Sequence, residues 1–297
     1  MPMNHDRLFK SRYVLPKWGE IALSSLLIAL ISGILIIPGF QSAAAPFKSL
    51  SMLVSSSRFG HFLHGCHAYA GDLFLLAMLM HVTEYVLKRF YRNYSWQSWL
   101  GLMVLLVSGM LAVFSGFLSL GNLESMDAVQ ILHHILYVSG AAGQALYRFL
   151  LLSSQNHSVL TVLMHHAATF TVLSVMLTYW HLKRFKADTY AFYYTFVLLA
   201  LLSALVPAGI GTHPQAQLAV VKGPWYFRGL QEMLSWLPVW LAGIGFPLAM
   251  IGLLSILPLW PQKESWILKA LGGMLLFYII ETIIATFFRG AGWQLIV

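Results

Sequence analysis

The feature that most constrains this chain is a series of seven apolar runs, each about 20 residues long, the length an α-helix needs to cross a bilayer core. Hydrophobic residues make up 59% of the 297 residues and charged residues only 9%, too few to hydrate the surface of a water-soluble domain. We therefore expect an all-α integral membrane protein with seven transmembrane helices, surrounded mainly by membrane lipid. The runs lie at residues 20–39, 64–87, 99–119, 159–182, 190–209, 239–259 and 267–288.

The basic residues indicate how the helices are oriented. The net charge is +8, and the 18 Lys and Arg occur in short clusters between the apolar runs, as in membrane-protein loops and unlike a nucleic-acid-binding face. Twelve share the side of the N-terminus, which predicts a cytoplasmic N-terminus, without a cleaved signal peptide, in a bacterial or archaeal inner membrane. The other side holds Lys48, Arg58, Arg148, Lys222, Arg228 and Arg289.

Four histidines inside two of the runs form a matched pattern. His67 and His81 are 14 residues apart, and His166 and His181 are 15 apart. At 3.5 residues per turn, 14 residues make four turns, so both rings leave one helix face about 21 Å apart along the axis. Because the second and fourth runs cross in the same direction, each outer histidine faces an outer one and each inner histidine an inner one. Neutral imidazole is a good axial ligand for iron, so we expect two bis-histidine b-type hemes in a four-helix bundle.

A structural role is the alternative interpretation of these histidines. A single intramembrane histidine more often bonds to a neighbouring helix than ligates a metal, but two matched pairs at corresponding depths favour heme. His165 has no histidine 14 or 15 residues further on. The single cysteine, Cys66, excludes Cys-ligated iron–sulfur clusters and covalent c-type heme attachment. We expect a second group of histidines at the outer surface: His61, His64, His133, His134, His157 and His213.

Around the four histidines the chain resembles the cytochrome b of bc-type and chloroplast bf-type complexes. HAYAGDLFLLAMLMH is similar to the segment with the first histidine pair, and VKGPWYFRGLQEML to the segment around the Pro-Glu-Trp-Tyr motif. The resemblance implies a diheme four-helix domain, 1–187, fused to a three-helix domain, 188–297. It also implies quinol or quinone chemistry, and it makes Gly33, Gly101 and Gly116 the positions where a helix approaches heme closely.

The chain departs from that family at positions with a chemical role. The Pro-Glu of the motif is replaced by Gly223-Pro224, which removes the carboxylate that accepts a proton from quinol. Glu232, two turns along the same segment, could replace it or could be a solvated interfacial carboxylate. Arg58 and Arg184 are candidates to pair with heme propionates. Near His181, Lys186 and Asp188 are polar candidates for a cytoplasmic quinone site.

The partners follow from the same reasoning. The chain carries no other redox ligands, so electrons must enter or leave the outer face through a multiheme cytochrome c or an iron–sulfur protein, docked on residues 120–158 and 210–238. The sequence thus predicts the membrane subunit of a quinol-dependent oxidoreductase, assembled with other subunits. One alternative is a diheme anchor of a dehydrogenase or reductase with a single quinone site. Another is a non-redox transporter with unrelated histidines.

Overall fold

The structure is a computed structural model that describes residues 16–40, 45–151, 158–183 and 188–296. The regular secondary structure of these residues is helical, apart from a single isolated β-bridge between Arg289 and Leu295, and the segment 206–227 is irregular. Five helical stretches in them are long and apolar enough to cross a membrane, in agreement with five of the seven predicted runs. They are Trp18–Gly39, Arg58–Leu87, Trp96–Leu118, Leu160–Leu182 and Pro261–Phe287.

The other two predicted runs form shorter apolar helices. Residues 190–209 give α9, Thr189–Leu205, and 239–259 give a π-helical turn, Leu241–Gly245, followed by α11, Phe246–Ile256. Pro207 explains the early end of α9, because a residue before proline is driven out of the helical region. Val206 accordingly has φ −118° and ψ 119°.

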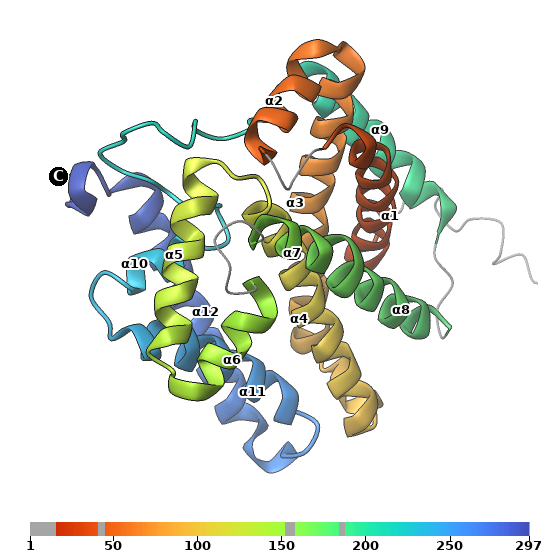
Figure 1. The fold of residues 1–297 in the computed structure, drawn as a ribbon. Coiled ribbons are helices and arrows are strands. Elements are labelled where there is room, and N and C mark those ends of the chain that lie inside the picture. Colours follow the sequence, from red (N-terminus) through yellow and green to blue (C-terminus); the bar gives the residue numbers. More distant parts are fainter. Residues whose placement is uncertain (1–15, 41–44, 152–157, 184–187, 297) are drawn as a thin grey trace, which may run out of the picture.

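Four long helical stretches surround the paired histidines. They are α1 (Trp18–Ile36), α3 (Arg58–Leu87), α4 (Trp96–Leu118), and α7 (Ser158–Met164), which continues through a π-helical segment, His165–Phe170, into α8 (Thr171–Leu182). In Figure 1, α4 lies at the centre of the molecule, with α1, α3 and α9 on one side. Small hydroxyl side chains let the helices approach closely, and Ser108 and Ser174 join α4 to α8 through a buried hydrogen bond of 2.6 Å.

The remaining helices lie on the other side of α4 (Figure 1). Two links tie them to the bundle at one end. The Trp99 indole donates to the Leu254 carbonyl at 2.7 Å, and the buried Glu264 pairs with Arg89 and Arg92. These helices are α5 (Leu123–Tyr137), α6 (Gly140–Leu151), α10 (Arg228–Met233), α11 and α12 (Glu264–Phe287), while α2 (Pro46–Ser56) packs against α3.

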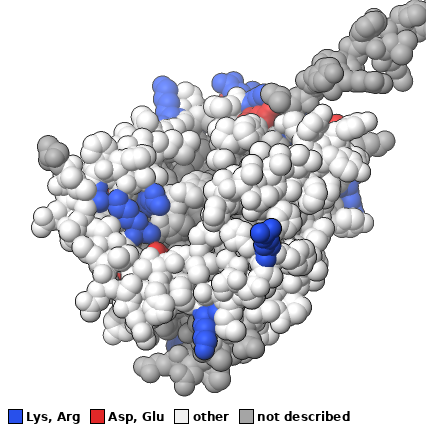
Figure 2. Space-filling view, turned by 90° about the horizontal axis from the view of Figure 1, so that it is seen from above, with Lys and Arg blue, Asp and Glu red and all other residues white. Residues whose placement is uncertain are grey.

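The two long connections between the apolar runs, 120–158 and 210–238, also contain helices. The amphipathic run 126–136 is part of the longer α5, whose N-terminus is capped by Asn122 accepting from the Ser125 amide at 2.8 Å. In the stretch 223–236, only Arg228–Met233 is an α-helix. Seen from above in Figure 2, the protein surface is mostly uncharged, with Lys and Arg in small groups. Such a surface fits an apolar surrounding.

Candidate functional site

The outer histidine pair brings together the second and fourth predicted runs. The ring centroids of His67 on α3 and His166 in the π-helical segment lie 6.0 Å apart, with the rings at 87° to each other. The Nδ1 of His67 lies 2.9 Å from the Ala29 carbonyl, and that of His166 lies 2.7 Å from the Ala112 carbonyl. A carbonyl only accepts hydrogen bonds, so both Nδ1 atoms carry the proton. Each Nε2 therefore keeps a lone pair that can bind a metal.

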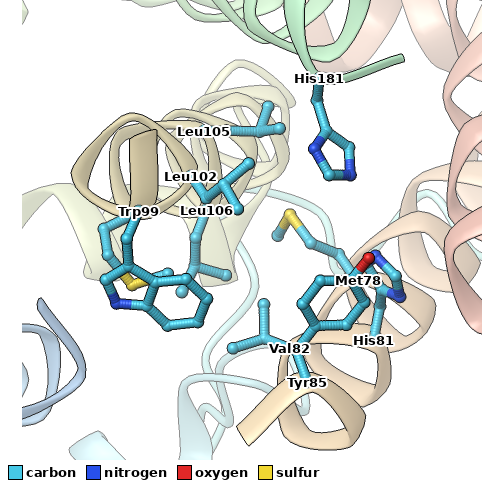
Figure 3. A pocket seen from close by; sticks show the side chains of 10 residues that line it. Met78, His81, Val82, Tyr85, Trp99, Leu102, Leu105, Leu106 and His181 are labelled. Carbon is cyan, nitrogen blue, oxygen red and sulfur yellow. The ribbon is translucent and has the colours of Figure 1, made fainter. Parts of the chain in front are cut away.

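The inner histidine pair has similar spacing and a different surrounding. The centroids of His81 on α3 and His181 on α8 lie 6.4 Å apart at 65°. Figure 3 shows the two rings entering one pocket, with Met78 between them and Trp99 and Leu106 of α4 on the opposite wall. The Nδ1 of His81 is buried and has no hydrogen-bond partner among the described residues.

A π-helical segment explains how 15 residues in one helix match 14 in another. A π-turn takes up one more residue than an α-turn, so the segment His165–Phe170 absorbs the extra residue between His166 and His181. Inside this segment, the His166 carbonyl accepts a hydrogen bond from the Thr171 hydroxyl. At both levels the α3 histidine can therefore face its partner, although the two sequence spacings differ by one residue.

Glycines lie directly behind three of the four rings. A Cβ atom at Gly33 would come within 2.9 Å of His67 Cε1, and one at Gly116 within 2.8 Å of His166 Cε1. Gly19, which our sequence reasoning missed, would come within 2.9 Å of His81 Cε1. Gly19 lies 14 residues before Gly33, the spacing of the α3 histidines, and that signal could have found it. A Cβ at Gly101 would meet the Trp180 ring at 3.3 Å.

The geometry of the pairs suits heme iron. Two metal–nitrogen bonds of about 2 Å and the two ring radii place the centroids of axial imidazoles about 6 Å apart. Both measured separations, 6.0 and 6.4 Å, match this value. In the part of the chain that the structure describes, no group of three or more His, Cys, Asp or Glu is arranged to hold a bare metal ion. A porphyrin would supply the other four ligands, so two histidines per level would be sufficient to hold heme iron.

The structure gives the contacts of three of the predicted polar residues, Glu232, Asp188 and Arg58. Glu232 is only 2% exposed, so it is not a solvated interfacial carboxylate. Its carboxylate accepts a hydrogen bond from the Arg289 guanidinium at 2.8 Å and another from the Trp293 indole at 3.0 Å. Asp188 is exposed and caps α9 by accepting from the Tyr190 amide. Arg58 is exposed at the start of α3, where it lines a surface pocket with His61.

The histidines predicted at the outer surface differ in their exposure. His64 is 6% exposed, with Nε2 3.5 Å from the Gly209 carbonyl, so its predicted place at the outer surface is wrong. The chain folds the segment 206–212 over α3 and covers this ring. His133, His134 and His213 are exposed as predicted. Arg184, Lys186 and His157 lie outside the described residues.

Comparisons with known proteins place the fold. No protein-family model matches the chain, and no curated protein does. Among solved structures, a chain of a "Hyperthermophilic respiratory Complex III" is similar with a TM-score of 0.66 and 17% sequence identity. The match covers 89% of this chain and 83% of that chain. The chain described here therefore shares its fold with a chain of a respiratory complex III.

Proposed function

We propose that this protein is the cytochrome b-type subunit of a quinol-dependent respiratory complex, carrying electrons across the membrane through two b hemes. The observation that carries the proposal is the presence of two facing histidine pairs, at 6.0 and 6.4 Å, at two levels of one bundle. The shared fold with a respiratory complex III chain supports it. Heme bound at each level supplies one-electron chemistry, and the chain supplies the axial ligands, their orientation and an apolar enclosure.

The roles of the protein groups follow from their contacts. His67 and His166 would hold the outer heme through Nε2, while the Ala29 and Ala112 carbonyls fix the ring orientation. His81 and His181 would hold the inner heme. Gly19, Gly33 and Gly116 leave room for the rings. Exposed Arg58 remains a candidate for an outer propionate, and Arg184 for an inner one.

The proposal includes the topology and the sites that the histidines alone do not define. We propose seven spans: α9, with 17 residues, is about 25 Å long and needs little thinning of the bilayer to cross it. The diheme half is then residues 1–187, the second half 188–297, and the N-terminus lies in the cytoplasm. Asp188 and Lys186 remain candidates for an inner quinone site. A multiheme cytochrome c or iron–sulfur protein docks on the outer loops.

The surroundings of Glu232 bear on the outer site. Both of its carboxylate oxygens face the Arg289 guanidinium, an arrangement that holds the negative charge and favours a structural role over proton uptake. If no other carboxylate served the outer site, the protein would have one quinone site, as in a diheme anchor of a dehydrogenase or reductase. This observation keeps the anchor as a second candidate function.

A spectrum of the purified full-length chain tests the proposal. We expect a reduced-minus-oxidised difference spectrum of six-coordinate b-type heme and a pyridine hemochrome assay giving two hemes per chain. Addition of a quinol analogue should reduce both hemes. Absence of visible absorbance would refute the proposal and support a transporter. Reduction of both hemes through one site, with a single inhibitor-sensitive heme, would favour the anchor.

A further inference from the structure

Asp72 is a carboxylate inside a helix long and apolar enough to span the membrane. It lies on α3 five residues after His67, about 7.5 Å further along the helix axis. Its side chain is exposed on the protein surface, and its Oδ1 accepts a hydrogen bond from the Trp225 indole at 3.0 Å. An ionisable group at such a depth is costly in lipid, so its presence points to a function.

Asp72 is held differently from the three carboxylates that pair with cations, and like Glu281, which accepts a hydrogen bond from the Trp236 indole. Glu232 pairs with Arg289, Glu264 with two arginines and Glu84 with Lys88. Among the described residues, no cation lies within ion-pair distance of Asp72, and one indole N–H is its recorded donor. A carboxylate neutralised by a cation keeps its charge, whereas one held only by a neutral donor can take up and release a proton.

Aromatic side chains form a wall next to this carboxylate. The ring of Trp225 lies 5.4 Å from that of Tyr226, Tyr226 lies 5.3 Å from Phe227, and Phe227 lies 4.4 Å from Phe114. Burial raises the pKa of the Tyr226 hydroxyl, and the nearby Asp72 carboxylate raises it further. The surface thus offers aromatic faces beside a polar group, the chemistry that suits a flat, apolar ring with hydroxyl groups.

The position of this wall connects it to the outer histidine pair. Trp225, Tyr226 and Phe227 belong to the segment between α9 and α10, in the C-terminal half, while Asp72 and Phe114 belong to α3 and α4 of the bundle. The outer pair is close along both helices, since His67 lies on α3 and Phe114 is two residues before Gly116, which backs His166. Asp72 is exposed at this junction of the two halves, where a lipid-dissolved molecule can reach it.

We propose that Asp72, held by Trp225, is the proton acceptor for a quinol bound at this junction. The inference rests on the proposed function and deepens it. In the step, the O–H bond of a quinol hydroxyl breaks and its proton passes to a carboxylate oxygen of Asp72, whose charge changes from −1 to zero. A heme held by His67 and His166 would accept the accompanying electron, and the second proton and electron of the quinol would leave in a second such step, after the partner protein on the outer loops has reoxidised that heme. Asp72 then releases the proton and is ready for another turnover.

The test compares Asp72→Asn with Glu84→Gln in membranes containing the whole complex. Glu84 is a carboxylate on the same helix that pairs with Lys88, so it is a matched control. With the inner quinone site blocked by an inhibitor, we expect D72N to keep both hemes and to slow their reduction by a benzoquinol or naphthoquinol analogue about 100-fold or more. E84Q should be reduced at the wild-type rate, and Asp72→Glu should recover most of the lost rate.

A second measurement does not depend on turnover. Redox-difference infrared spectra of the wild-type complex should contain a carboxylic-acid C=O band that disappears in D72N and persists in E84Q. Trp225→Phe keeps a ring at that place and removes the donor, so the band should change frequency. The infrared measurement on W225F remains informative even if D72N assembles poorly.

The outcomes separate the two proposals. If the wild-type protein lacks b hemes, the proposed function fails. If wild-type and D72N hemes are reduced by quinol equally fast, the proposed function stands and the role of Asp72 is refuted. An infrared band unaffected in W225F and in D72N would also overturn it.

Discussion

The outer and inner histidine pairs have nearly the same ring separation and differ in what holds the rings. At the outer level, both Nδ1 atoms meet main-chain carbonyls and both rings lie against glycines. At the inner level, the buried His81 Nδ1 has no partner among the described residues, and the rings border a pocket lined mainly by apolar side chains. The chain alone thus fixes tautomer and orientation of the outer rings, whereas the His81 ring is left freer to adjust to what it binds.

Removal of one ligand should have the largest effect on the difference between the two histidine pairs. His166→Ala takes away one of two outer ligands and leaves the inner pair intact, so heme content should fall by half while the inner heme keeps its spectrum. His165→Ala is the matched control, because His165 bonds to Thr169 and to the Phe149 carbonyl instead of facing His67. Heme quantitation and low-temperature difference spectra measure both. Equal loss in the two variants would contradict the ligand assignment.

A change in the helical spacing of His166 and His181 should have the second-largest effect, and it should act on the inner histidine pair. Inserting one Ala between Ala168 and Thr169 increases the separation of His166 and His181 to 16 residues, which one π-turn cannot absorb, so His181 should turn away by roughly 100°. The inner heme should be lost while the outer heme is retained.

Deletion of Ala168 is the paired variant for that insertion. It leaves 14 residues in a regular α-helix, the α3 spacing, and both hemes should remain bound. Loss of the outer heme alone in the insertion variant would show that the π-helical segment serves His166 and not the register of His181.

Valine substitutions at the glycines give a smaller, graded effect. A Cβ at Gly33 or Gly116 clashes with a ring that its hydrogen bond holds in place, and overpacking of this kind costs about 1–3 kcal/mol. We expect G33V and G116V to lower the thermal stability of the outer heme site more than G19V lowers that of the inner one, because the His81 ring can move aside. Gly71→Val on α3 is a control, since its Cβ would meet nothing within 4 Å. Heme dissociation during thermal melts measures the difference.

The smallest change concerns a second contact of the outer ring. The Ser32 hydroxyl lies 3.4 Å from His67 Nδ1, which already bonds to the Ala29 carbonyl at 2.9 Å. Ser32→Ala should therefore cost less than about 1 kcal/mol and shift the midpoint potential of the outer heme slightly. Potentiometric titration should show the inner heme unchanged; a shift confined to the inner heme would reverse the assignment of the two levels.

Much of the architecture could be predicted from local patterns. A run of apolar residues long enough for a bilayer specifies a helix without knowledge of its neighbours, and the run 64–87 is found inside α3. The histidine spacings are equally local, because residues four turns apart share a helix face. The short helix α9 was overestimated by four residues at its C-terminal end because the effect of Pro207 on the residue before it was not applied.

Other features required the folded chain. Glu232 was predicted either to replace the missing proton acceptor or to lie in water, and its burial against Arg289, 57 residues away, could not be read from either segment. Asp72 was overlooked because its donor, Trp225, is 153 residues further along the chain. The covering of His64 by the segment near Gly209 is of the same kind.

The sequence by itself determined the helices, their apolar surroundings and the faces on which the four histidines lie, because helical periodicity and transfer into lipid depend on neighbouring residues. Only the tertiary structure decided how closely the paired rings approach, which carbonyls orient them, and that an extra turn residue brings His166 and His181 into register with α3. It also decided that Glu232 is paired with a cation and Asp72 is held by an indole. The physical reason is that hydrogen bonds, ion pairs and close contacts act over a few ångströms, between residues that the chain separates widely.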